Sequence, residues 1–327
     1  MTEQSVKERE KQEKREKKIL KSEAKDNMFR LNRIKPVTNF FFNLLFLILA
    51  LACLLPIVFI FIISITDETV IRTQGYQFYV TAKTVSTSAY QYLWTQRKTI
   101  LGAMWVSVKV TAIGTILGVV LTTLMGYVLS RREYRLRGFY TMLIFIPMVF
   151  GGGLAASYVV NTQILHLGNT LAILILPLAV SSFNVVIART FFQSTIPDSV
   201  IESARLDGAT QGTIFLKIVL PISKPVLATI ALFLAFGYWN DWYQSMLYIK
   251  DPELQSLQAM LNSMQKNLEY LTKNPTAGLT STDMIRKMPQ ESVRMAIAFV
   301  VAVPIASVYP FFQKYFISGL TVGAVKG

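Results

Sequence analysis

Residues Ile196–Pro225 read IPDSVIESARLDGATQGTIFLKIVLPISKP, and the interpretation of the whole chain starts from them. The stretch lies between two long apolar runs, so it is predicted to be a water-exposed loop joining two membrane spans. Pro197 suits a first helical turn, and Asp198 and Ser199 place acceptor oxygens near the N–H groups left free there. Gly208 is predicted to end this short helix, because glycine accepts the left-handed backbone of a helix cap.

The short helix is predicted to be two-sided. Val200, Ile201 and Ala204 give it an apolar side, whereas Glu202 and Arg205 give it a charged one. A second helical piece follows the glycine, and two prolines mark the return to the membrane. The residues of that second part are Phe215, Ile218, Val219, Pro221 and Pro225.

Composition independently indicates a membrane protein. Hydrophobic residues make up 52% of the chain and charged residues only 16%, and the mean hydropathy is +0.42. The net charge of +14 does not indicate nucleic acid, because the basic residues lie on loops between apolar runs without an aromatic–basic motif. A single cysteine, Cys53, and a single histidine, His166, exclude an internal disulfide and a cysteine or histidine metal cluster.

Motifs for enzyme chemistry are missing from the sequence. The glycine-rich 319–327 segment lacks the spacing of a phosphate-binding G-x-x-x-x-G-K-[ST] loop, and G-x-S-x-G and H-E-x-x-H do not occur. We therefore predict no catalytic residue, no metal site and no cofactor bound by this chain.

Six apolar stretches are each long enough to cross about 30 Å of hydrocarbon. They are Phe40–Ile65, Ala103–Ser130, Gly138–Val160, Thr170–Ile187, Val226–Tyr248 and Met295–Phe316. We predict a charged N-terminal segment over residues 1–38 and a six-span domain over residues 39–327. Gly151–Gly153, within the third stretch, is expected to permit close helix packing or local bending.

Orientation follows from the Lys and Arg residues on alternate sides of these spans. With Lys314 counted in the C-terminal tail, one side carries 22 of them and the other carries 10, so the richer side is predicted to be cytoplasmic. That side holds both termini, the 131–137 and 188–224 loops and the 317–327 tail, whereas the 249–294 loop is external. The N-terminal segment itself is expected to be either disordered or a solvated helix near anionic lipid.

Ionisable residues inside apolar stretches are costly, so they are candidates for function. Lys109 is one, and snorkelling towards the headgroups explains it as well as function does. Asp241 is the other, and it lies among Trp239, Asn240, Trp242 and Tyr243. Aromatic faces stack on sugar rings while amides and carboxylates bind hydroxyls, so these residues are predicted to line a substrate path. An interfacial aromatic belt is the alternative, although it does not explain a buried Asn240 or Asp241. Asn184 is predicted to face the same path.

The Ile196–Pro225 loop closely resembles the EAA loop of binding-protein-dependent ABC importer permeases. The family pattern is present as Glu202-Ser203-Ala204, Asp207-Gly208-Ala209, Phe215 and Leu220-Pro221, with Ser203 in place of alanine. In the family this loop forms a helix parallel to the membrane that docks into the cytosolic ATPase. The resemblance therefore implies a coupling role for these residues, with Glu202 and Asp207 fixing the loop, Gly208 making the turn and Ala204 allowing close docking.

The C-terminal residues Gln313–Phe316 and Gly319–Gly327 are similar to the tails of carbohydrate-importer permeases of the maltose type. Together the resemblances cover the chain from about Phe40 onward. They imply an all-α type I ABC importer permease fold with six transmembrane helices and a cytoplasmic coupling helix.

The same resemblance implies the surroundings of the chain. The expected partners are a homologous but non-identical permease, two cytosolic ATPase subunits that use ATP and Mg, and an extracellular solute-binding protein. The expected substrate is a carbohydrate, such as an oligosaccharide, and the expected location is the bacterial cell membrane. A permease for another solute and a membrane-anchored sensor or scaffold remain the alternatives.

Overall fold

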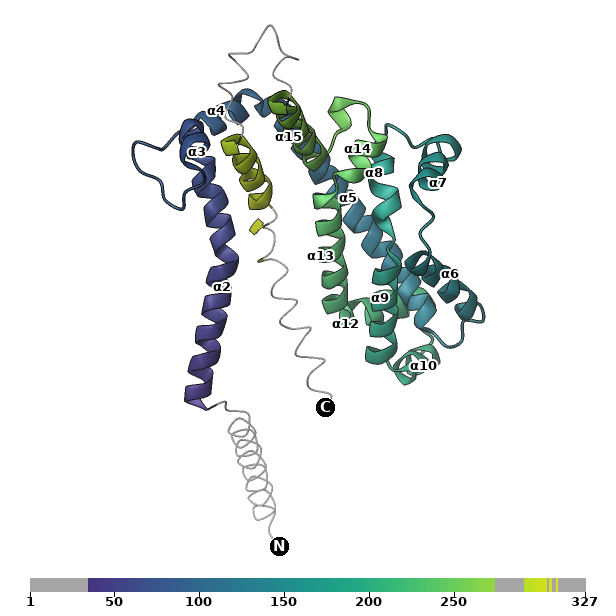
Figure 1. Cartoon of the computed structure of the whole chain (residues 1–327). Coiled ribbons are helices and arrows are strands. Elements are labelled where there is room, and N and C mark those ends of the chain that lie inside the picture. The colour runs from purple at the N-terminus through teal and green to yellow at the C-terminus, as the bar shows by residue number, and fades with distance from the viewer. Residues whose placement is uncertain (1–34, 274–290, 305, 308–309, 311–327) are drawn as a thin grey trace. The chain divides into compact units, whose positions relative to one another are not determined.

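The structure is a computed structural model that describes residues 35–273, 291–304, 306, 307 and 310 (Figure 1). Within this part of the chain the regular structure is helical, with one isolated bridge between Thr66 and Val85. This confirms the predicted all-α class. The N-terminal segment up to residue 34 and the tail from residue 311 lie outside the described residues, so the predictions made for them are not addressed.

The chain divides into two compact units, Met1–Phe59 and Ile60–Gly327. The described part of the first unit belongs to helix α2 (Pro36–Ser64), which corresponds to the first predicted span. Its 29 residues extend about 43 Å at the usual rise per residue, more than the roughly 30 Å of hydrocarbon in a bilayer. Its side chains are almost all exposed, as suits a helix surrounded by lipid or by another subunit. The predicted domain boundary at residue 38 stays a prediction.

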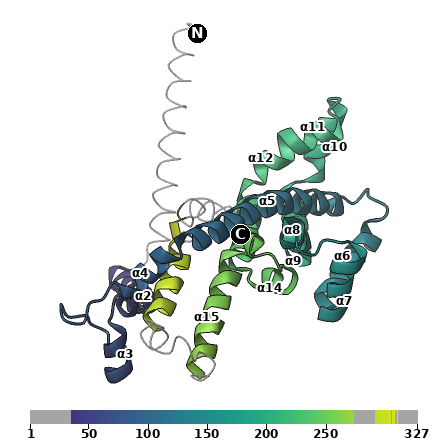
Figure 2. The same ribbon diagram turned by 90° about the horizontal axis from the view of Figure 1, so that it is seen from above.

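The second unit is built around the long helix α5 (Arg97–Ser130). Three helices pack along it: α8 (Leu171–Ala179), α9 (Ser182–Thr195) and α13 (Lys224–Asn240). Figure 1 labels all three, and Figure 2 shows α8 and α9 beside α5. The other helices of this unit include α3 (Glu68–Gln74), α4 (Ser88–Thr95), α6 (Arg137–Val149), α7 (Leu154–Val159), α10 (Asp198–Leu206), α11 (Gln211–Ile214), α12 (Leu220–Ile222), α14 (Tyr243–Tyr248) and α15 (Leu257–Lys273).

Glycines on α5 allow this close packing. A methyl group added at Gly118 would lie 2.6 Å from the Ala179 carbonyl oxygen of α8, and one added at Gly126 would lie 2.6 Å from the Ala188 side chain of α9. Gly114, four residues before Gly118, lies directly against the ring of a tyrosine on α13. The spacing is the G-x-x-x-G pattern of close helix contacts in membranes.

The predicted third span is broken rather than continuous. Helix α6 ends at Val149 and α7 begins at Leu154, and the axes differ by 117° across the break. Gly153 adopts a φ of +78°, which favours glycine, and Pro147 weakens the helix just before the break. A side chain added at any of Gly151–Gly153 would meet open space. Of the two expected roles of these glycines, the structure therefore shows bending and not close packing.

The fourth predicted span also contains a break. Helices α8 and α9 differ in direction by 44°, and Val180 and Ser181 between them are extended. Pro177 lies in the last turn of α8, where its ring and missing N–H group disturb helical hydrogen bonding. The fifth span is interrupted at Asp241 and Trp242, between α13 and α14.

In the described part of the chain, two helices are long and apolar enough to cross a membrane, or up to five spans if each bent pair counts as one. The sixth predicted span, Met295–Phe316, is only partly described: residues 291–304 are helical. The count of six therefore stays a prediction.

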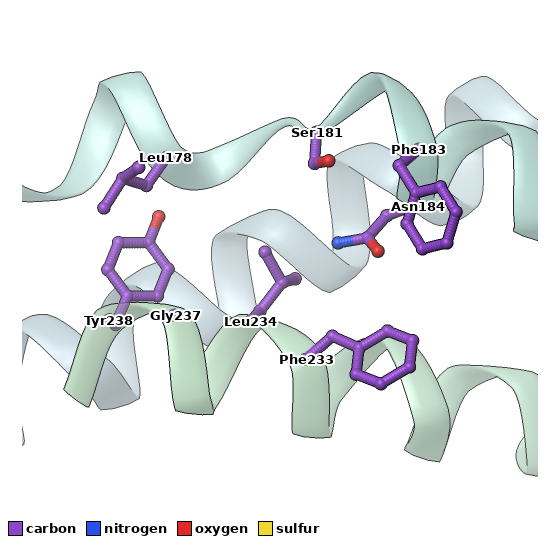
Figure 3. Close-up of a pocket in the computed structure, with 8 residues that line it drawn as sticks. All are labelled: Leu178, Ser181, Phe183, Asn184, Phe233, Leu234, Gly237 and Tyr238. Carbon is purple, nitrogen blue, oxygen red and sulfur yellow. The ribbon is translucent and has the colours of Figure 1, made fainter. Parts of the chain in front are cut away.

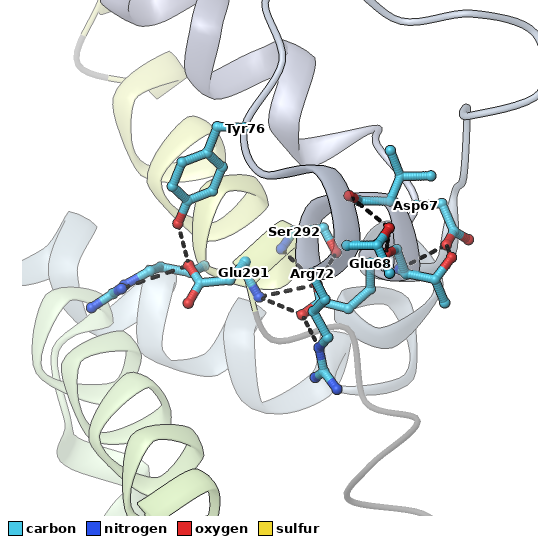
Figure 4. Close-up of polar contacts among 10 residues, drawn as sticks. Asp67, Glu68, Arg72, Tyr76, Glu291 and Ser292 are labelled. Atoms are coloured by element: carbon cyan, nitrogen blue, oxygen red, sulfur yellow. Dashed lines mark hydrogen bonds and ion pairs between the residues drawn. The ribbon is translucent and has the colours of Figure 1, made fainter.

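The start of the 291–304 helix is held by a residue from far away in the sequence. The buried carboxylate of Glu68 accepts hydrogen bonds from the backbone N–H groups of Glu291 and Ser292, at 3.1 and 3.2 Å, and from the Ser292 hydroxyl at 3.2 Å (Figure 4). Arg72 pairs with the same carboxylate at 3.1 Å. A carboxylate at a helix N-terminus stabilises it by supplying acceptors for free N–H groups.

Candidate functional site: an exposed helix held at both ends, and a pocket at a helix break

Helix α10 has one face inside the protein. Ile201 and Ala204 are buried in the main hydrophobic cluster, close to Tyr127 of α5 and Phe192 of α9. The rings of Tyr127 and Phe192 meet edge to face, with centroids 6.0 Å apart. The predicted apolar side is thus confirmed for two of its three residues, whereas Val200 is exposed.

The C-terminus of α10 closes in a Schellman motif. The Gly208 N–H donates to the Arg205 carbonyl and the Ala209 N–H to the Ala204 carbonyl, both at 2.9 Å. Gly208 has a φ of +79°, a conformation that costs other L-residues about 1–2 kcal/mol. The structure confirms the predicted glycine turn and explains why glycine occupies it.

The N-terminus of α10 differs from the prediction. Pro197 is the N-cap, one residue before the helix, and α10 starts at Asp198 without a side-chain cap. The Asp198 carboxylate instead accepts a hydrogen bond from Arg131 Nη1 at 3.1 Å. Pro197 thus precedes the first turn in which it was predicted, whereas Asp198 lies in that turn as expected.

Arg131, at the end of α5, makes contacts with α5, α9 and α10. Besides Asp198, it donates from Nη2 to the Phe192 carbonyl at 3.2 Å and from Nε to the Ser130 hydroxyl at 2.9 Å. Its guanidinium also lies over the Tyr127 ring, 5.3 Å from the centroid. The side chain is only 11% exposed, so this contact is largely shielded from water.

A second ion pair holds the other end of α10. Arg205 Nη1 lies 2.7 Å from the Glu133 carboxylate. With the Gln211 amide oriented so that its oxygen faces the guanidinium, it accepts from Nε and Nη2 at 3.1 and 2.8 Å. Both ends of α10 are thus connected to the loop that follows α5. Neither of these long-range contacts was among the predictions made from the sequence.

The opposite face of α10 is open to solvent. Leu206 is 89% exposed, and Glu202, Ser203, Asp207 and Gly208 are exposed around it. This open face is the part of the predicted coupling helix that remains accessible to another protein. Ala204, predicted to allow close docking, faces the interior of this chain instead.

Two of the remaining residues of the predicted coupling loop pack against the same hydrophobic cluster as α10. Phe215 packs on Tyr127 with ring centroids 5.1 Å apart, and Ala209 packs against the same cluster. Pro221 is exposed in α12. The loop is therefore a compact helical unit and not a flexible connection.

A pocket of about 340 Å³ lies between the α8–α9 break and α13 (Figure 3). Its lining residues are Leu178, Ser181, Phe183, Asn184, Phe233, Leu234, Gly237 and Tyr238. The Tyr238 hydroxyl is already used, because it donates to the Ile175 carbonyl at 2.7 Å. Asn184 and Ser181 are the other polar residues of the lining.

The aromatic cluster predicted to join Asn184 lies apart from this pocket. Trp239 is buried in a second hydrophobic cluster, whereas Trp242 and Tyr243 are exposed. Asn240 is exposed as well, with its amide bonded to the Phe236 carbonyl of its own helix at 3.0 Å. The expectation of a buried Asn240 is therefore wrong, because the side chain turns away from the bundle.

Asp241 ends α13 and faces the start of α14. It is partly buried, and its carboxylate accepts from the Gln244 N–H at 3.3 Å. Lys109 is exposed on α5 and lies over the Trp105 ring, 5.3 Å from the centroid, an arrangement that suits the snorkelling explanation. Among the described residues there is no group of three or more potential metal ligands.

Apolar helices packed around α5, with a well-anchored short helix exposed on the surface, are typical of an integral membrane protein. Comparison with known proteins gives the family. The profile described as "Binding-protein-dependent transport system inner membrane component" matches residues 114–322. The chain belongs to this family and is a permease subunit of ABC transporters, not itself an enzyme.

Relatives from Bacillus subtilis (strain 168) align along most of their lengths. The chain is 36% identical to the "Polygalacturonan/rhamnogalacturonan transport system permease protein YtcP" over 296 residues, which cover 90% of this chain and 99% of the relative. It is 35% identical to "Protein LplC" over 269 residues, covering 82% and 88%.

A solved structure shares the fold. A chain in the crystal structure of a bacterial ABC transporter involved in the import of the acidic polysaccharide alginate superimposes with a TM-score of 0.71. The sequences are 29% identical, and the match covers 86% of this chain and 96% of that one.

Proposed function

We propose that this chain is one of two different permease subunits of an ATP-driven importer that brings a carbohydrate into the cytoplasm. The other subunits would be two cytosolic ATPases and an extracellular solute-binding protein. A carbohydrate substrate is supported by YtcP, by the alginate importer chain and by the arabino-oligosaccharide permease AraQ from Halalkalibacterium halodurans, which is 25% identical over 90% of this chain. No nucleotide or metal binds to this chain in the proposal, because the ATPases use ATP and Mg.

The observation that carries the proposal is the geometry of α10. Its ends are connected to the 131–137 loop by Arg131 and Arg205, and its outer face presents Leu206. A helix held in this way would transmit the movement of an ATPase to α5 and α9. It would stay attached to the helix bundle while doing so. The switch between inward-open and outward-open states is then an exchange between two packed arrangements.

The charge bias and α10 together support the orientation. ATP is cytosolic, so the Leu206 face would be cytoplasmic, as would both termini of a six-span chain in the bacterial cell membrane. The exposed groups around Leu206, including Glu202 and Asp207, would then contact the ATPase. Ala204, Ala209 and Phe215 would hold α10 against the bundle.

The substrate path is proposed to include Asn184 and the Trp239–Tyr243 cluster, at two different places. Asn184 would act at the pocket beside the helix break. Trp242 and Tyr243, exposed beyond the end of α13, would meet the sugar earlier. Asp241→Ala is expected to weaken uptake without reducing assembly of the complex.

The test is purification of the chain with its partners, followed by reconstitution. The intact mass in mild detergent should contain one different permease and two ATPase copies. Leu206→Asp is expected to release the ATPases while leaving the chain in the membrane, whereas Leu206→Met should keep them. A Leu206→Asp complex that retains its ATPases and normal uptake would contradict the proposal.

Two further readouts separate the alternatives. Oligosaccharides, but not peptides or amino acids, should stimulate the ATPase of the reconstituted complex. A sensor or scaffold that acts through its basic N-terminus would lose function when residues 1–35 are deleted, whereas a permease should tolerate most of that deletion.

A further inference from the structure

The break between α8 and α9 leaves donors without partners near the middle of a predicted span. Ser181 is the N-cap of α9, but its side chain makes no capping hydrogen bond. The N–H groups of the first turn of a helix have no partner within the helix. Inside a bilayer, such irregular backbone is tolerated only where protein covers it or where it lines a cavity. Here Ser181, Phe183 and Asn184, from the start of α9, line the pocket.

Asn184 adds a second, independent feature to the same place. It is only 5% exposed, and its amide has no hydrogen-bond partner among the described residues. Figure 3 shows the amide directed into the space between α9 and α13. An amide that lines the pocket and has no partner in the described protein can donate to a ligand that enters it.

The walls favour a ring-shaped ligand with an anionic group. Phe233 offers an aromatic face from α13, Leu234 lies beside it, and Gly237 leaves open space where a side chain would otherwise stand. No residue of the lining is acidic. The N-terminus of α9 carries the positive end of the helix dipole, which favours a negative ligand.

We propose that this pocket holds one ring of an acidic sugar, with its carboxylate at the N-terminus of α9. Asn184 Nδ2, the Ser181 hydroxyl and the free N–H groups donate to the carboxylate, and the ring lies against Phe233. A volume of about 340 Å³ is at the lower end of the range for small-molecule sites, so it suits a single ring and not a longer chain. This inference rests on the proposed carbohydrate import and specifies the class of sugar.

The test compares two sugars with the same rings and linkages: trigalacturonate and its fully methyl-esterified, neutral form. Uptake of both is measured in proteoliposomes containing the whole complex and its solute-binding protein, with a neutral maltotriose as a third probe. The wild type should take up the acidic sugar in preference to its ester. Asn184→Leu should lower acidic uptake about tenfold, because a hydrogen bond to a charged group is lost, and should change ester uptake less than twofold.

Asn184→Asp has nearly the same shape but places a negative charge beside the carboxylate, so its acidic uptake should fall below that of Asn184→Leu. If the wild type prefers the acid but both variants keep the wild-type ratio, the solute-binding protein selects the sugar and the pocket assignment is wrong. Import of neutral sugars in preference to the acid would overturn the acidic class and leave the proposed importer intact. If no sugar drives uptake or ATPase activity, the proposed function itself is wrong.

Binding of sugar in the pocket can be measured as protection of an engineered cysteine from thiol modification. Cys53 is the only native cysteine, so Cys53→Ser followed by Gly237→Cys places a single thiol on the pocket wall. Trigalacturonate, but not its ester, should slow modification of that thiol during turnover. The thiol could instead react in the isolated chain and fail to react in the assembled complex, with or without sugar. That result would show that a partner side chain fills the pocket, and it would refute the proposal.

Discussion

Arg131 provides the sharpest test of how α10 is held. Its guanidinium bonds the Phe192 carbonyl at 3.2 Å and the Asp198 carboxylate at 3.1 Å, and lies over the Tyr127 ring. Arg131→Lys keeps the charge but loses the planar group that reaches all three. A shielded hydrogen bond from a charged group contributes about 1.5–3 kcal/mol, whereas an exposed ion pair contributes about 0–1 kcal/mol.

Asp198 is 55% exposed, so most of the effect should come from the bond to the carbonyl. We therefore expect Arg131→Lys to cost about 2 kcal/mol, which shifts the equilibrium between held and released α10 roughly thirtyfold. Asp198→Ala should cost less than about 1 kcal/mol. Arg132→Lys, at an exposed neighbouring position, is the matched control.

The measurement is amide hydrogen exchange over residues 198–206 in the assembled complex, together with the number of sugar molecules imported per ATP. Faster exchange and poorer coupling are expected in Arg131→Lys alone. Unchanged exchange in Arg131→Lys would refute the reasoning. Equal losses in Arg131→Lys and Asp198→Ala would show that the ion pair, and not the carbonyl contact, holds the helix.

Three other predictions address the glycines and the distant helix cap. Gly208→Ala should cost about 1 kcal/mol at its positive φ and impair coupling modestly, whereas Gly208→Pro should insert but abolish transport; normal uptake by the proline variant would contradict this. Gly118→Ala should lower the melting temperature of the complex, because its methyl group would meet a backbone oxygen at 2.6 Å. The control Gly102→Ala, on the same helix, meets open space, so it should leave the melting temperature unchanged or raise it. Glu68→Gln should destabilise the start of the 291–304 helix by about 1–3 kcal/mol, seen as faster exchange there; unchanged exchange would mean that the carboxylate is not needed as a cap.

Much of the fold and of the α10 surface could be predicted because the signals are local. A glycine after a short amphipathic helix predicts a left-handed cap, and Gly208 has one. Long apolar runs predict spans, and α2 and α5 correspond to two of them. These local signals did not indicate the distant contact in which Arg131 bonds the Asp198 carboxylate.

The contacts that hold α10 could not be inferred from the sequence. Arg131 and Asp198 are 67 residues apart, and Arg205 and Glu133 are 72 residues apart, so no helical periodicity relates them. Part of the packing does have a local signal, because Gly114 and Gly118 form a G-x-x-x-G pattern in the sequence.

The helix break at Val180 and Ser181 has a consequence for how the protein is made. The pair Leu171–Thr195 must enter the membrane with an interrupted backbone, and unpaired backbone N–H and C=O groups are costly in lipid. Its buried face is complementary to the glycine surface of α5. During biosynthesis, therefore, this segment should leave the translocon stably only after α5 is already in place, and folding within the membrane should follow an order set by α5.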